Sequence, residues 1–193
     1  VTVFNGEIYN FAEVKDYLEK KGHMFRTHSD TEVIVHSYEE FGLDCVDHFR
    51  GMFAIAVYDS TKKILMLARD RLGIKPLYYY LQDDVLVFAS EIKPILASGY
   101  YRASVNPDAI DCFITMGYVP GETTAFKGIK KLEPGHIGVF SEGRFSVRQY
   151  WDIIEYGTLD IPLSKAKTRL EDLLSEVTQL HLISDVPLGV FLS

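Results

Sequence analysis

The sequence is poor in cysteine, has no excess of positive charge and contains no long hydrophobic run. Its 193 residues include two cysteines, Cys45 and Cys112, and neither belongs to a Cys-x-x-Cys pair. A disulfide framework or a cysteine zinc site is therefore not indicated, and both cysteines are expected to be buried as small hydrophobic residues. Lys and Arg number 20 against 27 Asp and Glu, and the formal charge of −7 argues against a nucleic-acid partner.

The apolar runs are too short to cross a bilayer, which takes roughly 20 residues in a helix. No charged leader with an apolar centre opens the chain, so we expect a cytoplasmic protein without a membrane partner. The chain starts at Val1 without Met and stops at Ser193 inside an apolar run. We therefore interpret it as a piece of a longer protein.

The order of β-rich runs predicts a mixed architecture with much antiparallel pairing rather than a strict βαβ repeat. A first strand is expected at Val1–Phe4. Three hairpins are predicted from paired runs joined by turn residues: Met52–Tyr58 with Ile64–Ala68, Leu77–Leu81 with Val85–Ala89, and Ile137–Phe140 with Phe145–Arg148.

Capping patterns mark three helix starts in the same region, at Asn10 with Glu13, at Ser29 with Glu32, and at Asn106 with Pro107. Gly22 and Gly42 are expected to end the first two helices, and the third should run to about Met116. Residues 1–150 therefore form one predicted domain.

The pattern changes after residue 150. Apolar residues at helical spacing between Ala166 and Leu180 predict a long amphipathic helix, and Val186–Leu192 reads as a buried strand. Residues 151–193 are therefore expected to be a linker followed by the first helix and strand of a second, α/β domain.

Asn5-Gly6-Glu7 follows the first predicted strand. An Asn side-chain amide and the next residue's N–H are two donors that an oxyanion hole requires. Taken alone, Asn-Gly is more often a turn.

Asp30, in Ser29-Asp30-Thr31-Glu32, offers a carboxylate at a helix start that could receive the ammonium group of an amino-acid substrate. The alternative is a simple capping box, with Asp30 favoured by the helix dipole.

Two further segments have structural and functional readings. Arg69–Tyr79 packs four charged residues around a Gly and a Pro, which favours a salt-bridged corner. Ser184–Ser193 ends in a small hydroxyl residue, as a strand before a phosphate loop does, but an ordinary core strand fits equally well. The six histidines show no metal-ligand spacing, so surface or capping roles are expected for them, and no metal site is predicted.

Together these residues resemble the glutamine-dependent asparagine synthetase family, a class II amidotransferase joined to an ATP-dependent synthetase. The resemblance covers essentially the whole chain and is carried by Phe4–Asn10, Ser29–Glu32, Arg50–Ala54, Arg69–Tyr79, Ala89–Lys93 and Ser184–Ser193. The stretches Met116–Gly121 and Lys127–His136 resemble bacterial relatives associated with exopolysaccharide and exosortase systems.

The resemblance implies an α+β, N-terminal-nucleophile fold, with two antiparallel sheets between helical layers. An N-terminal Cys whose α-amine acts as base would attack the amide of glutamine and release ammonia. The synthetase part, an ATP-pyrophosphatase-type α/β domain, would use ATP with Mg²⁺ to activate aspartate for conversion to asparagine. The family implies a possible homodimer.

Residue by residue, Asn5 and the N–H of Gly6 match the family's oxyanion hole and contact glutamine, while Glu7 and Asp30 match its other glutamine-binding groups. Leu192 and Ser193 match the beginning of its ATP loop.

The resemblance has one departure: the family's opening Met-Cys-Gly-Ile and its arginine segment have no counterpart in this chain. We therefore expect the isolated piece to be inactive as a glutaminase, and we expect it to bind neither ATP nor another cofactor. Two other readings remain open: an amidotransferase for another acceptor in exopolysaccharide biosynthesis, and a non-catalytic module that binds glutamine or a partner protein.

Overall fold

The computed structural model describes residues 1–153, 158, 160–183 and 186–191. The chain divides into two compact units, Val1–Asp152 and Ile153–Ser193, which are considered separately. The assignment of the second unit to a synthetase domain stays a prediction.

A five-stranded antiparallel sheet lies at the centre of the first unit, with the strand order β1-β2-β3-β7-β8. Its strands are β1 (Thr2–Ile8), β2 (Gly51–Asp59), β3 (Ile64–Arg69), β7 (His136–Ser141) and β8 (Arg144–Gln149). β2 is buried on both faces, which explains its continuous apolar sequence.

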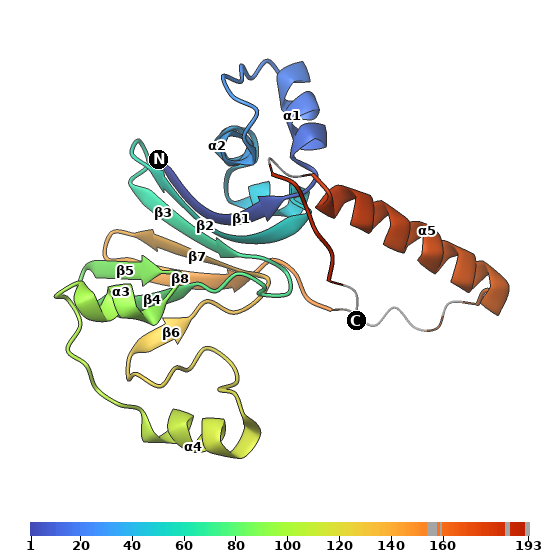
Figure 1. The fold of residues 1–193 in the computed structure, drawn as a ribbon. Coiled ribbons are helices and arrows are strands. Elements are labelled where there is room, and N and C mark those ends of the chain that lie inside the picture. The colour runs from blue at the N-terminus through green and yellow to red at the C-terminus, as the bar shows by residue number, and fades with distance from the viewer. Residues whose placement is uncertain (154–157, 159, 184–185, 192–193) are drawn as a thin grey trace. The chain divides into compact units, whose positions relative to one another are not determined.

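Two helices and a 3₁₀ helix cover one face of this sheet (Figure 1). They are α1 (Phe11–Lys20), α2 (Asp30–Phe41) and η1 (Gly42–His48). Val14 and Leu18 of α1 and Ile34 of α2 belong to the same buried cluster as Phe53 and Ile55 of β2. Apolar residues recur every 3.6 positions in the helices and every second position in the strands, so in each element they lie on the face that contacts this core.

The other face of the sheet packs on a second sheet with the order β5-β4-β6. This sheet consists of β4 (Tyr78–Gln82), β5 (Val85–Ala89) and β6 (Ile129–Lys131). Ala54 and Leu67 of the first sheet share a buried cluster with Tyr79 of β4. Tyr78 and Tyr80, which alternate with Tyr79, pack instead near Ile95 of α3 (Ile92–Ala97). The first unit is therefore a helix–sheet–sheet–helix sandwich, as the resemblance predicted (Figure 1).

The three predicted hairpins are confirmed, while α3 and β6 are short elements that no sequence pattern marked. The fourth helix, α4 (Pro107–Met116), has its predicted bounds.

Two of the three predicted caps are wrong in detail. The Asn10 side chain does not cap α1; it donates to His48 O and accepts from Arg50 N, which fastens the turn after β1 to the segment before β2. Likewise, Asn106 donates to Thr124 O instead of capping α4. Amide side chains that can bond both a donor and an acceptor elsewhere do not have to cap their own helix.

Ser29 does cap α2, because its Oγ accepts from Thr31 N at 3.2 Å. Glu32, the other half of the pattern, accepts instead from the N–H groups of Arg26 and Thr27. The hydrogen bond from the Thr27 hydroxyl, followed by that from Arg26 N, lowers the pKa of Glu32 to about 2.

The predicted salt-bridged corner is held together by backbone hydrogen bonds instead. The Asp70 carboxylate, which is 1% exposed, accepts from four backbone N–H groups, those of Phe53, Leu72, Ile74 and Lys75. The Arg69 guanidinium donates to three carbonyl oxygens, those of Gly73, Lys75 and Leu132. Both side chains thus fix the loop after β3 by bonding its main-chain groups, although Leu72 and Ile74 of this loop are exposed.

The second unit contains α5 (Leu163–His181), the predicted amphipathic helix. The predicted strand Val186–Leu192 is wrong for its described part, because residues 186–191 form no strand. A strand requires backbone pairing with a neighbouring strand, and this segment belongs to neither of the two described sheets. Leu192 and Ser193 lie outside the described residues.

Candidate active site at the open edge of β1

The sequence had suggested that Asn5, Gly6 and Glu7 follow a strand or form a turn. In the structure they lie inside β1. β1 is the first strand in the order of its sheet and pairs with β2 on one side. Its other side is an open edge, because the described residues form no strand beside it. Main-chain groups on that edge are therefore available to a ligand.

Hydrogen bonds of Phe53, the residue opposite Gly6, show which way the Gly6 N–H points. Phe53 N donates to the Asp70 carboxylate at 3.1 Å, and Phe53 O accepts from Asp70 N at 2.9 Å. Both main-chain groups of Phe53 thus point away from β1. In an antiparallel ladder this makes Gly6 and Phe53 a non-hydrogen-bonded pair. The N–H of Gly6 consequently points to the open edge.

Ile8 has the same orientation as Gly6, two residues further along β1. Its N–H donates to Oδ2 of Asp30 at 3.2 Å. The Asp30 carboxylate therefore lies beside the same edge, about 7 Å further along the strand if the ordinary rise per residue applies. The sequence places Asn5 and Asp30 far apart, and the structure brings them to one edge.

Gly6 cannot be replaced by a residue with a side chain without moving β2. Its φ is +152°, and an added Cβ would lie 2.0 Å from Met52 O and 2.8 Å from the Phe53 Cα. The close approach is a property of non-hydrogen-bonded pairs, in which the two Cα atoms come nearest to each other. Gly6 thus allows β1 and β2 to keep a regular register next to the candidate oxyanion donor.

Asn5 projects from the sheet face opposite α1 and α2. Its Nδ2 donates to Ser90 Oγ, just after β5, at 3.0 Å. Asn5 and Ser90 line a cavity of about 130 Å³ between the two sheets, together with Val3, Ala54, Ile55, Ala56, Leu77, Phe88 and Ala89. Because an amide nitrogen carries two protons, Nδ2 keeps one donor for a ligand while Ser90 holds its orientation.

Asp30 is the first residue of α2, after the cap at Ser29. Its Oδ1 has two hydroxyl contacts, from Ser29 and Thr31, each at 3.5 Å, so this oxygen has capacity left for a stronger donor. The positive end of the helix dipole favours a carboxylate there. The capping interpretation and the binding interpretation of this segment are therefore compatible, because Ser29 caps while Asp30 faces β1.

Glu7 is exposed and two residues before Tyr9. Burial raises the pKa of Tyr9, and the negative charges of Glu7 and Asp70 raise it further. Glu7 lies on β1, the strand that also carries Asn5 and Gly6, and its charge reaches the Tyr9 hydroxyl.

Cys45 lacks the features of a nucleophile. Cys45 is buried in η1 as predicted, and burial raises the pKa of its thiol to about 12, so it is protonated near neutral pH. Cys112, on α4, is partly exposed, and the prediction that it is buried is wrong.

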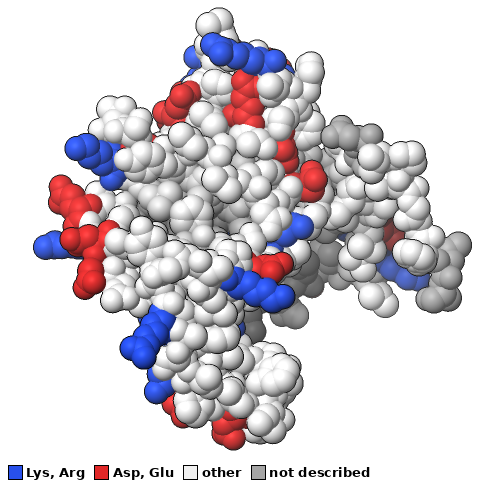
Figure 2. Space-filling view, turned by 60° about the vertical axis from the view of Figure 1, so that its left-hand side comes forward, with Lys and Arg blue, Asp and Glu red and all other residues white. Residues whose placement is uncertain are grey.

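The charged side chains on the face shown in Figure 2 are scattered, with both signs interspersed around an uncharged middle. This face offers no continuous basic patch of the kind that binds nucleic acid. None of the helices that the structure describes is long and apolar enough to cross a membrane.

A family model described as a glutamine amidotransferase domain matches residues 1–151. The chain belongs to this family. The matched region coincides with the sandwich that carries Asn5, Gly6 and Asp30, so the open edge of β1 lies within a glutamine amidotransferase domain.

Relatives of this amidotransferase chain include synthetases of the predicted family. Asparagine synthetase [glutamine-hydrolyzing] 3 of Bacillus subtilis is 38% identical over 193 residues, covering 99% of this chain and 31% of that protein. Putative asparagine synthetase [glutamine-hydrolyzing] 2 of Methanocaldococcus jannaschii is 36% identical over 200 residues, covering 100% of this chain and 38% of that protein. The chain thus spans about a third of the length of these relatives and is of the asparagine synthetase glutaminase-domain kind.

The fold class is confirmed by a solved structure. Glutamine phosphoribosylpyrophosphate amidotransferase from B. subtilis matches with a TM-score of 0.54 at 20% identity, covering 79% of this chain and 29% of that chain. At this identity the likeness concerns the fold, which is the N-terminal-nucleophile sandwich.

Ser90 is a site residue that sequence reasoning did not single out. Its segment, Ala89–Lys93, contributed to the resemblance, but no local pattern assigned it a partner. The Ile8 N–H is a second missed contributor, because a backbone donor leaves no signature in a sequence.

Proposed function

We propose that this amidotransferase domain binds glutamine along the open edge of β1 and stabilises the oxyanion formed when its side-chain amide is attacked. The donors are Asn5 Nδ2 and the Gly6 N–H. Asp30, assisted by Glu7, receives the α-ammonium group. The observation that carries the proposal is the shared orientation of the Gly6 and Ile8 N–H groups, since the second of these holds Asp30.

The dimensions of this edge suit glutamine. The separation of about 7 Å between the Gly6 donor and the Asp30 region is comparable to the length of an extended glutamine from its side-chain amide to its ammonium group. A donor pair at one end and a carboxylate at the other match the two polar ends of the substrate.

In the longer protein that we infer from the relatives' lengths, the released ammonia would convert aspartate to asparagine in an ATP-dependent step. ATP with Mg²⁺ supplies the activation of the aspartate carboxylate. Leu192 and Ser193, assigned to ATP by resemblance, lie outside the described residues, so their role stays a prediction.

The test compares two activities of the longer protein. Asn5→Ala should lower glutamine hydrolysis by about 10²–10³, the usual effect of losing one oxyanion donor. Asparagine formation from aspartate, ATP and added ammonia should change less than twofold. Ser90→Ala, which removes the partner of Asn5 but keeps both donors, should cost roughly 2–10-fold in glutamine hydrolysis, as expected for one neutral hydrogen bond.

A loss below tenfold in Asn5→Ala would contradict the oxyanion assignment. Ser60→Ala, an exposed residue in the β2–β3 turn, serves as the control and should leave both activities unchanged. If the protein hydrolyses glutamine but forms no asparagine, aspartate is not its acceptor.

A further inference from the structure

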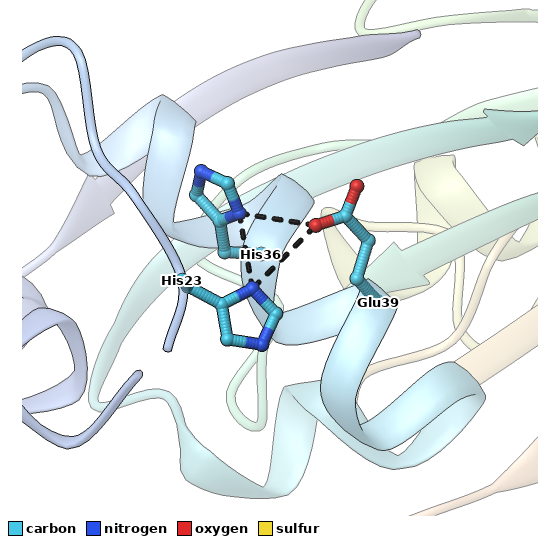
Figure 3. A group of neighbouring side chains, drawn as sticks. All are labelled: His23, His36 and Glu39. Carbon is cyan, nitrogen blue, oxygen red and sulfur yellow. Dashed lines mark hydrogen bonds and ion pairs between the residues drawn. The ribbon is translucent and has the colours of Figure 1, made fainter. Parts of the chain in front are cut away.

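A cluster of His23, His36 and Glu39 lies on the helical layer, outside the glutamine site. His23 follows α1, whereas His36 and Glu39 are three residues apart on α2. The distance between the two Nδ1 atoms is 3.2 Å, and the Glu39 Oε2 lies 3.0 Å from His36 Nδ1 and 3.6 Å from His23 Nδ1 (Figure 3). Sequence spacing assigned all six histidines surface or capping roles and did not indicate this cluster, because His23 and His36 come from different segments.

We propose that these three side chains form a binding site for a divalent transition-metal ion such as Zn²⁺. Zinc binds histidine nitrogen and carboxylate oxygen at about 2.0–2.2 Å in tetrahedral geometry, which puts its ligand atoms roughly 3.3–3.5 Å apart. The three observed distances bracket this value. One ion therefore fits between the three atoms with their backbone positions unchanged.

The far sides of both rings support the same assignment. His23 Nε2 lies 3.3 Å from Glu40 Oε2, and His36 Nε2 lies 3.7 Å from Glu32 Oε1. At His23 the Glu40 carboxylate is within hydrogen-bond distance and favours the tautomer in which Nε2 carries the proton, so that Nδ1 presents a lone pair toward the cluster. At His36 the longer distance to Glu32 is that of an ion pair. Metal-binding histidines are commonly held by carboxylates in this way.

Without an ion, the 3.0 Å contact between His36 Nδ1 and Glu39 Oε2 fits a hydrogen bond in which Nδ1 carries the proton. A bound cation would take the place of this proton, and the lone pairs of all three atoms would then point at positive charge.

The surroundings provide both rigidity and access. The histidine side chains are 16% and 17% exposed, and the Phe25 ring packs against the His36 ring at 4.4 Å between centroids. Glu39 is 56% exposed, so an ion can enter from its side and a water can fill the fourth position. Two imidazoles with one carboxylate favour Zn²⁺, Ni²⁺ or Co²⁺ over Mg²⁺ and Ca²⁺.

A metal here would tie the segment after α1 to the middle of α2. That segment leads to Ser29 and Asp30, at the beginning of the same helix. The site is therefore structural, and its occupancy is independent of whether glutamine is the substrate.

The experiment uses the 193-residue chain after treatment with EDTA. Isothermal titration with Zn²⁺ should show one ion bound per chain, Zn²⁺ should raise Tm, and Mg²⁺ should do neither. Co²⁺ should give the visible absorption of a nitrogen- and oxygen-ligated tetrahedral site. His23→Ala, His36→Ala and Glu39→Gln should each weaken Zn²⁺ binding at least tenfold, and Glu40→Gln, beside a ligand, by roughly 10–100-fold.

His28→Ala is the matched control, because His28 is exposed in the same segment and outside the cluster. It should bind Zn²⁺ as the unchanged chain does. Glu39→Gln alters an exposed side chain and so tests the site where a histidine variant fails to fold. Absence of stoichiometric Zn²⁺ binding, or equal binding by Glu39→Gln and the unchanged chain, would overturn the proposal. Neither result depends on glutamine hydrolysis.

Discussion

Asp70 and Asp30 both place a carboxylate beside backbone N–H groups of the same β-sheet, but they use different shares of their hydrogen-bonding capacity. Asp70 is buried and accepts from four N–H groups. Asp30 is partly exposed and accepts from one N–H group, that of Ile8. A saturated carboxylate holds the fold, whereas a carboxylate with free acceptor positions can still bind a ligand.

Asp70 and Asp30 also lie near the same part of β1, because Asp70 bonds Phe53 opposite Gly6 and Asp30 bonds Ile8. Asp70 bonds both main-chain groups of Phe53, so Phe53 and Gly6, which face each other across β2 and β1, form a non-hydrogen-bonded pair. In such a pair the Gly6 N–H points to the open edge. Asp70 therefore belongs to the strand pairing in which the Gly6 N–H, the candidate oxyanion donor, faces the open edge beside Asp30.

The largest effect is expected from removing the saturated carboxylate. Asp70→Ala leaves four N–H donors to find other acceptors, and each buried donor left without one costs about 1–3 kcal/mol. We expect the free energy of unfolding, measured by urea denaturation, to fall by at least about 3 kcal/mol. Asp44→Ala, which removes an exposed partner of Arg148, should change it little. Equal effects of the two would contradict the structural role of Asp70.

Gly6→Ala tests the close approach of β1 and β2. The added Cβ would lie 2.0 Å from Met52 O, so β1 must shift and the oxyanion donors must shift with it. Glutamine hydrolysis by the longer protein should fall by more than 10³, more than for Asn5→Ala. Gly22→Ala is matched for positive φ but has nothing within 4 Å of its added Cβ, and should keep this activity. If Gly6→Ala stays active, the strand register is less constrained than this structure shows.

Asp30→Asn keeps an acceptor for the Ile8 N–H but removes the negative charge. We expect the KM for glutamine to rise at least tenfold while kcat changes less and Tm stays within a few degrees. Steady-state kinetics of glutamate release measure this, with Asp16→Asn on the exposed face of α1 as the control. An unchanged KM would mean that Asp30, like Asp70, has only a structural role.

Glu32 is a third case, partly exposed and bonded to Arg26 N, Thr27 N and the Thr27 hydroxyl. Its folded pKa of about 2 lies below the ordinary value of 4.5, so its ionised form stabilises the folded chain. That contribution is complete above about pH 4.5 and is lost as the pH falls toward 2. The stability advantage over Glu32→Gln, measured as a difference in urea midpoint, should shrink across this range. A difference that does not change with pH would rule out the charge as its cause.

Local patterns predicted those elements whose residues interact with close neighbours in sequence. The hairpins and the helices α1, α2, α4 and α5 follow from turn residues and helical spacing, and Ser29 caps α2 as predicted. Asn10 and Asn106 carried the same cap pattern, but tertiary partners at His48 and Thr124 satisfy them instead. Capping is one among several local uses of an amide, so distant partners can override it.

The sequence by itself indicated a mixed architecture with antiparallel hairpins, and through resemblance it predicted the fold class and a candidate site that joins Asn5, Gly6 and Asp30. Tertiary structure alone decided that Gly6 faces an open edge, that Ser90 orients Asn5, and that His23 meets His36 and Glu39. The reason is physical: periodicity reports which face of an element is buried, whereas the direction of a backbone N–H and the meeting of side chains depend on which strands and helices become neighbours.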